Sequence, residues 1–225
     1  LDYWDTIFSA FIDGDTTQVD SLLQDSLQSF FYELVIFQDT VYNRTFHIIR
    51  EQLDTSYLDI NDPGNADDDV VGAFRNGWGM FIINPNAERE QVIIQVPHPC
   101  DDFIAPYVAL DLFLQVDSYA FMINGAGREV LWTGVGNFSN SKSLSDPSRY
   151  PYTVFQKFQE NVTDPLINTD PHYPLVFAIH SFDNNTHLPR KSVILAAGAQ
   201  NPLTNKPIRD ISGCLLYTSP SPRDQ

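Results

Sequence analysis

The sequence predicts an α/β fold, with a central, mostly parallel or mixed sheet, helices on both of its faces and a helical segment at the N-terminus. Short apolar runs alternate along the chain with stretches of helical periodicity. The runs are apolar throughout instead of alternating with polar residues, which is typical of strands covered on both faces. The 225 residues, 43% of them hydrophobic, suffice for one sizeable core.

We expect one domain over residues 1–213, made of an N-terminal helical layer over residues 1–65 and a sheet core over residues 66–213. Residues 214–225 do not continue the preceding pattern and resemble the conceptual translation of a sequencing adapter, which is not native sequence. Two Ser-Pro steps and little apolar content predict that this tail is disordered. The chain begins at Leu1, without Met, so we expect native sequence to be missing at both ends.

The N-terminal layer begins with residues 1–14, which are rich in aromatic side chains and end in an Asp-Gly turn. Asp15 then offers an N-cap to a helix whose apolar side chains recur at helical spacing. We interpret residues 16–54 as one or two amphipathic helices. Residues 54–70 carry Asn-Asp-Pro-Gly turn chemistry and predict a loop.

The sheet core opens with two short apolar runs, residues 77–83 and 91–96, separated by a polar connection. This arrangement predicts a hairpin or two neighbouring strands. A helix is expected to start between Asp102 and Pro106 and to end near Asp117, and residues 119–123 form the next strand. A strand, a helix and a strand over about 30 residues have the size of a βαβ unit.

Further along the chain, residues 137–151 are polar and predict a surface loop, and residues 153–162 carry apolar side chains at helical spacing. Residues 175–179 predict a third buried strand, which ends in His180. Residues 192–197 predict a fourth strand.

Composition excludes several classes of partner. The net charge of −16 argues against nucleic acid, because phosphate binding needs clustered Lys and Arg. No apolar run approaches the roughly 18 residues that span a bilayer, so no membrane contact is predicted. Four Asn-x-Ser/Thr sequons favour a secreted or extracellular glycoprotein; they begin at Asn43, Asn137, Asn161 and Asn184.

Two histidines directly follow apolar runs that are expected to be buried strands. His98 comes after residues 92–97, and His180 comes after residues 175–179. If these strands are parallel and adjacent, both imidazoles reach one sheet edge, where Asp101 or Asp102 also arrives. Two imidazoles and one carboxylate leave a fourth position for water, as in a catalytic Zn²⁺ site. Taken singly, a histidine at a strand end is as readily explained as the partner of a backbone carbonyl.

The motif VPHPCDD over residues 96–102, followed by a helix and then FMINGAGR over residues 121–128, resembles the zinc amidohydrolases related to N-formylglutamate amidohydrolase. These belong to a phosphorylase/hydrolase-like fold that includes the zinc carboxypeptidases. The resemblance implies that His98 and His180 are zinc ligands. It implies Asp102 as the acidic ligand on the spacing of secreted relatives, and Asp101 on the carboxypeptidase spacing.

The chain departs from that family pattern in two places. Where the family has Gly-Thr-His-Arg character, this chain has Gly-Ala-Gly-Arg, which lacks the histidine and keeps the arginine as Arg128. The segment SDPSR over residues 145–149 looks like an Asp-x-x-His segment whose histidine is replaced by Arg149. Arg128 follows a strand end, so we interpret it as a clamp for a substrate carboxylate, with a surface salt bridge as the alternative.

The sequence therefore predicts a secreted, zinc-dependent hydrolase of an amide or peptide bond in a small-molecule or peptide substrate with an anionic group. Candidate catalytic bases are Asp183 and whichever of Asp101 and Asp102 is not a ligand. A non-catalytic secreted glycoprotein with a degenerate site is the first alternative. A hydrolase with Cys100 as nucleophile is the second, although a small buried filler is the simpler interpretation of Cys100.

Overall fold

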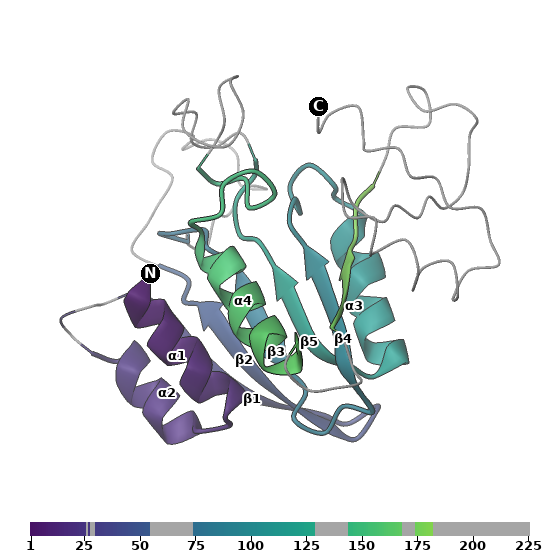
Figure 1. Ribbon diagram of the computed structural model, residues 1–225, viewed down its shortest axis with the longest axis horizontal. Coiled ribbons are helices and arrows are strands. Elements are labelled where there is room, and N and C mark those ends of the chain that lie inside the picture. The colour runs from purple at the N-terminus through teal and green to yellow at the C-terminus, as the bar shows by residue number, and fades with distance from the viewer. Residues whose placement is uncertain (26, 28–29, 55–73, 129–143, 168–173, 182–225) are drawn as a thin grey trace, which may run out of the picture. The chain divides into compact units, whose positions relative to one another are not determined.

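The structure is a computed structural model that describes residues 1–25, 27, 30–54, 74–128, 144–167 and 174–181, all within one compact unit, Leu1–Ser181. These residues form a mixed six-stranded sheet and four helices, which confirms the predicted α/β class (Figure 1). In chain order the elements are α1 (Asp2–Ile12), α2 (Thr16–Leu23), β1 (Tyr32–Asp39), β2 (Arg44–Glu51), β3 (Met80–Ile83), β4 (Arg89–Val96), α3 (Ala105–Val116), β5 (Ser118–Ile123), α4 (Val154–Ile167) and β6 (Leu175–Ala178).

The strand order is β1-β2-β3-β5-β4-β6. Strands β1, β2, β3 and β5 pair antiparallel, whereas β4 runs parallel to both β5 and β6. The β4-α3-β5 segment is the predicted βαβ unit. Because β4 and β6 are adjacent and parallel, the segments that follow their carboxyl ends emerge at the same edge of the sheet.

The prediction of helices over residues 16–54 is wrong beyond α2. Asp15 does cap α2, accepting a hydrogen bond from the Gln18 N–H at 2.9 Å. After α2, however, β1 and β2 form an antiparallel hairpin. The hairpin is rich in aromatic and β-branched residues, which suit a pleated sheet. Phe46 and Ile49 are buried in the cores on opposite faces of the sheet, so apolar side chains point both ways and imitate a helical pattern.

The predicted hairpin or adjacency of the strands at residues 77–83 and 91–96 is also wrong, because β5 lies between β3 and β4. Residues 77–79 do not join the strand but pack against the β5 end. Gly79 has φ +105°, and a Cβ there would lie 2.1 Å from the Ile123 carbonyl oxygen. A Cβ on Gly125 would lie 2.7 Å from the Gly79 backbone nitrogen. Glycine at both positions therefore allows the backbone approach that holds the chain after β5 in place.

Helices cover both faces of the sheet, as predicted. Helices α1, α2 and α4 pack on one face, where Phe8 and Phe158 lie with ring centroids 5.0 and 4.9 Å from Phe81 of β3. Helix α3 covers the other face, where Phe113 packs against Phe121 of β5. The helix expected at residues 153–162 is α4 (Val154–Ile167).

Strand β6 is more exposed than predicted. Phe177 is 39% exposed, and within the described residues β6 pairs only with β4. The predicted strand at residues 192–197 and the tail at residues 214–225 lie outside the described residues. Within the described part of the chain, the helices are too short or too polar to span a membrane.

Candidate metal and substrate site

The turn after β4 brings His98 and Asp102 to the same side of the chain. The backbone N–H of Asp102 donates to the His98 carbonyl oxygen at 2.8 Å, and the Asp101 N–H donates to the same oxygen at 3.2 Å. These bonds fold residues 98–102 into a single tight turn. His98 is 2% exposed and Asp102 is 6% exposed, so both polar side chains are buried and need partners.

Strand β6 delivers the second histidine to this turn. The ladder between β4 and β6 continues past the paired residues, because the Ile179 N–H donates to the Gln95 carbonyl oxygen at 2.9 Å. The next residue, His180, therefore lies beside the β4 end. Its side chain is 42% exposed, so one side of the cluster is open to solvent.

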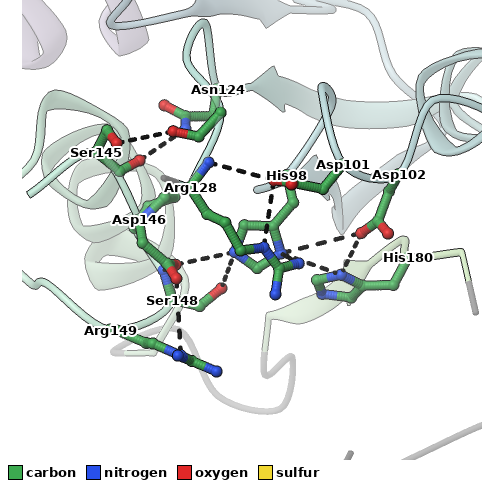
Figure 2. Close-up of polar contacts among 12 residues, drawn as sticks. His98, Asp101, Asp102, Asn124, Arg128, Ser145, Asp146, Ser148, Arg149 and His180 are labelled. Carbon is green, nitrogen blue, oxygen red and sulfur yellow. Dashed lines mark hydrogen bonds and ion pairs between the residues drawn. The ribbon is translucent and has the colours of Figure 1, made fainter. Parts of the chain in front are cut away.

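His98, Asp102 and His180 form a compact group of possible metal ligands (Figure 2). The Nδ1 atom of His180 lies 2.8 Å from Oδ2 of Asp102 and 3.4 Å from Nδ1 of His98. Nδ1 of His98 lies 3.9 Å from the same Asp102 oxygen. Ligands of a tetrahedral zinc ion with bonds of about 2.0–2.1 Å lie roughly 3.4 Å apart. The separations of 2.8, 3.4 and 3.9 Å therefore lie within about 0.6 Å of the spacing that such a site requires.

His98 is oriented by a third carboxylate, from the loop before α4. Its Nε2 atom lies 2.9 Å from Oδ1 of Asp146 and 3.1 Å from the Ser148 hydroxyl. Burial raises the pKa of Asp146, but its hydrogen bond to His98, the Ser148 N–H and the nearby Arg149 lower the pKa overall. Asp146 is therefore an acceptor, and we assign the His98 proton to Nε2. This assignment leaves the Nδ1 lone pair directed into the cluster.

Asp102 is likewise held as a carboxylate. Its Oδ1 atom accepts a hydrogen bond from the Ser181 hydroxyl at 3.0 Å, while Oδ2 faces His180. Burial raises the pKa of Asp102, but the contacts with His180, Ser181 and His98 lower it below its usual value. A buried, ionised carboxylate beside two imidazoles is an electronegative position that favours a cation.

Arg128 turns inward to this cluster. Its backbone N–H and its Nε–H both donate to Oδ2 of Asp101, at 3.2 and 3.3 Å. Its Nη2 atom lies 2.8 Å from Nδ1 of His98, the nitrogen that faces the other two candidate ligands. Asp101 therefore pairs with Arg128 and lies outside the group of three, so the geometry favours Asp102 over Asp101 as the acidic ligand.

The loops that carry Arg128 and Asp146 are tied to each other. The Asn124 side-chain amide donates to the carbonyl oxygens of Ala126 and Ser145, at 2.9 and 3.0 Å. The Ser145 hydroxyl in turn donates to the Gly127 carbonyl oxygen at 2.8 Å. Figure 2 shows these contacts beside the histidines. Arg128 and Asp146 are thus positioned by one hydrogen-bonded unit.

Sequence reasoning gave no role to Asp146 or Ser148. The signal was present in the segment SDPSR, where the Ser148 N–H donates to the Asp146 carboxylate at 3.0 Å in a local turn. Two further candidates from the sequence, Asp183 and Cys100, are not part of this cluster in the described residues. Asp183 lies outside the described residues. Cys100 is exposed instead of buried, and no histidine in the described part of the chain hydrogen-bonds its sulfur.

The donor set fits a divalent metal ion, because one nitrogen is pre-oriented and one carboxylate is ionised. Two imidazoles and a carboxylate suit Zn²⁺ and equally other first-row transition metals, so the set by itself does not select zinc. No family model matches the chain, and neither the curated proteins nor the solved structures compared with it gave a match.

Proposed function

We propose that this protein is a metal-dependent hydrolase of amide or peptide bonds, with Zn²⁺ held by His98, Asp102 and His180. The observation that carries the proposal is the convergence of these three side chains on one point, with the His98 ring oriented by buried Asp146. Zinc bound there would polarise a carbonyl oxygen and lower the pKa of a coordinated water.

The chain's own residues supply binding and orientation. Asp146 fixes the tautomer of His98, and Ser181 fixes the Asp102 carboxylate. Arg128 places a positive charge in contact with His98 and presents several N–H donors, which suits a carboxylate or another small anion on the substrate. The exposed side of His180 leaves a path from solvent to the ligand atoms.

Asp101 is the candidate base among the described residues. Its carboxylate accepts two hydrogen bonds from Arg128, which in turn contacts His98. Both Arg128 donors contact Oδ2 of Asp101, so the Asp101 side chain becomes available as a base when the Arg128 side chain engages a different anion, such as the substrate carboxylate.

A non-catalytic protein with a degenerate site is the second candidate function. The observation that favours it is the contact between Arg128 Nη2 and Nδ1 of His98. In the family that the sequence resembles, the corresponding histidine binds a metal ion. A lost site is expected to have drifted apart, to more than about 8 Å between imidazoles that no longer share a metal bonded at about 2 Å. The separation of 3.4 Å between the His98 and His180 nitrogens supports the metal-binding proposal instead.

Secretion is also part of the proposal, and the sequons at Asn43 and Asn161 lie within the described residues. Asn43 is exposed in the turn between β1 and β2. Asn161 lies inside α4, where its amide donates to Asp5 of α1 at 2.8 Å. Of these two described sequons, Asn43 presents its side chain as a glycosyltransferase requires, in an exposed turn.

The test is hydrolysis of N-acyl amino acids by protein that has been stripped with a chelator and then reloaded with Zn²⁺. Each substrate is paired with its C-terminal amide, which lacks the carboxylate. We expect hydrolysis only after reloading, faster with the free carboxylate, and loss of activity in His98→Ala but not in His47→Ala on β2. Bound zinc with no zinc-dependent hydrolysis of any acyl substrate would sink the enzymatic proposal and favour the non-catalytic one.

A further inference from the structure

We infer that Arg128 couples the metal site to anion binding: the guanidinium and the metal compete for Nδ1 of His98, so an anion that engages Arg128 strengthens metal binding. The inference rests on the metal site proposed above and concerns how an anion regulates metal binding at that site. Its basis is a single nitrogen that faces both the candidate ligands and the Arg128 side chain.

The competition follows from the chemistry of imidazole. The Nε2 proton of His98 is committed to Asp146, so Nδ1 has one lone pair and no hydrogen. The Arg128 Nη2 atom lies 2.8 Å from Nδ1, in the direction of a hydrogen bond to that lone pair. A metal bonded to Nδ1 at about 2 Å occupies the place of the guanidinium hydrogen. The same lone pair cannot serve both, and a guanidinium so close to a divalent cation is also repelled.

Arg128 can leave His98 without leaving the loop. Its backbone N–H and its Nε–H both donate to Asp101, and the preceding residues Ala126 and Gly127 are held through their carbonyl oxygens. The Nη2 arm therefore moves by side-chain rotation alone. When it moves, Nη2 loses its acceptor on His98, and Asp101 is the partner that remains to the guanidinium, through Nε. A partly buried N–H donor without an acceptor is costly, so Nη2 needs another one. An anionic ligand supplies that acceptor.

The two binding events are consequently linked. Metal binding displaces Arg128 and exposes the guanidinium to an anion, while a bound anion removes Arg128 from His98. Because linkage is reciprocal, each ligand raises the affinity for the other by the same factor, which for such couplings is typically about 5- to 150-fold. A substrate with a carboxylate therefore completes the metal site to which it binds.

The experiment is a zinc titration of the whole chain, monitored by competition with a chromogenic chelator, in the presence of N-acetylglycine or of its neutral amide. Arg128→Gln removes the guanidinium. Arg50→Gln is the matched control, because Arg50 pairs with Glu33 on the β1–β2 hairpin and makes the same change of charge at an exposed position. Circular dichroism of both variants verifies that each is folded.

We expect N-acetylglycine, but not the amide, to lower the zinc Kd of the parent and of Arg50→Gln by about 5-fold or more. Arg128→Gln should bind zinc more tightly than the parent without any anion and should show no further response to N-acetylglycine. Zinc binding that ignores N-acetylglycine in the parent overturns the inference, as does an equal response in Arg128→Gln, which would indicate direct coordination by the carboxylate. Failure of all three proteins to bind zinc would instead overturn the proposed function.

Discussion

The Nε2 atom of His98 and the Oδ1 atom of Asp146 lie 2.9 Å apart, and both side chains are almost fully buried, at 2% and 3% exposure. The two residues are 48 positions apart in the sequence and come from different loops. A carboxylate on the outer nitrogen of an imidazole fixes its tautomer and increases its basicity toward a metal. This contact distinguishes the cluster from two histidines that merely cap strand ends.

Replacing Asp146 with Asn should therefore weaken metal binding without removing a ligand. An amide can accept the His98 proton but supplies no negative charge, and the loss expected for such an orienting residue is about 10- to 100-fold in affinity. Zinc titration of Asp146→Asn measures it. Asp111→Asn is the control, because Asp111 lies on the exposed surface of α3. Equal zinc affinity in the two variants would contradict the orienting role.

The stability of the metal-free protein should depend on pH through Asp146. Its folded pKa is lowered, so the contribution is fully present above the unfolded value near 3.8 and is lost as the pH falls through the folded value. Urea unfolding between pH 5 and pH 3 should show the difference in unfolding free energy between the parent and Asp146→Asn shrinking as the pH falls. Asp102 titrates in both proteins, so its effect cancels. A difference that is constant or grows over this range would refute the expected sign.

The face of the sheet that supports α4 should be sensitive to truncation. Phe158 is fully buried, with its ring 5.0 Å from that of Phe8 and 4.9 Å from that of Phe81. Phe158→Ala should lower the free energy of unfolding by about 3–5 kcal/mol, since it removes apolar contact and leaves a cavity. Tyr152→Ala, at a side chain that is 69% exposed, should change it by less than about 0.5 kcal/mol. Similar midpoints in chemical denaturation for both variants would count against this packing.

Expression through a eukaryotic secretory pathway should modify Asn43. The residue is exposed, and its φ of +52° is the left-handed conformation that Asn tolerates in turns. Peptide mass spectrometry should find glycan at Asn43 and little at Asn161, whose amide is hydrogen-bonded to Asp5 and to the Lys157 carbonyl oxygen. Asn43→Gln should abolish the signal. An unmodified Asn43 in secreted protein would remove the support that this sequon gives to secretion.

The local patterns in the sequence were sufficient for the βαβ unit and, given adjacent parallel strands, for the convergence of His98 and His180 with one of Asp101 and Asp102. Both depend on apolar runs that end in polar residues, which sequence displays directly. The order of strands was not predictable in this way, because β5 inserts between β3 and β4 through pairing between distant segments. The β1–β2 hairpin was missed because apolar side chains occupy both faces of these strands, some of them exposed, so neither strand shows a regular alternation of polarity.

In the site, too, some residues were predictable from local sequence patterns and others depend on contacts between distant segments. The three candidate ligands come from strand ends, whereas Asp146 comes from a loop whose position is set by α4 and by the tie between Asn124 and Ser145. The inward turn of Arg128 depends on its pairing with Asp101, which is 27 positions away. Sequence indicated that these loops are polar but not which of their side chains meet.

The most direct test of the account is isothermal titration of Zn²⁺ into the metal-free protein. We expect one ion per chain, and a loss of affinity in His98→Ala, Asp102→Ala and His180→Ala that exceeds the roughly 10- to 100-fold expected for Asp146→Asn. His47→Ala, which removes a histidine from β2, should bind as the parent does. Absence of stoichiometric zinc binding, or equal affinity in the parent and the three ligand variants, would contradict the assignment of this cluster as a metal site.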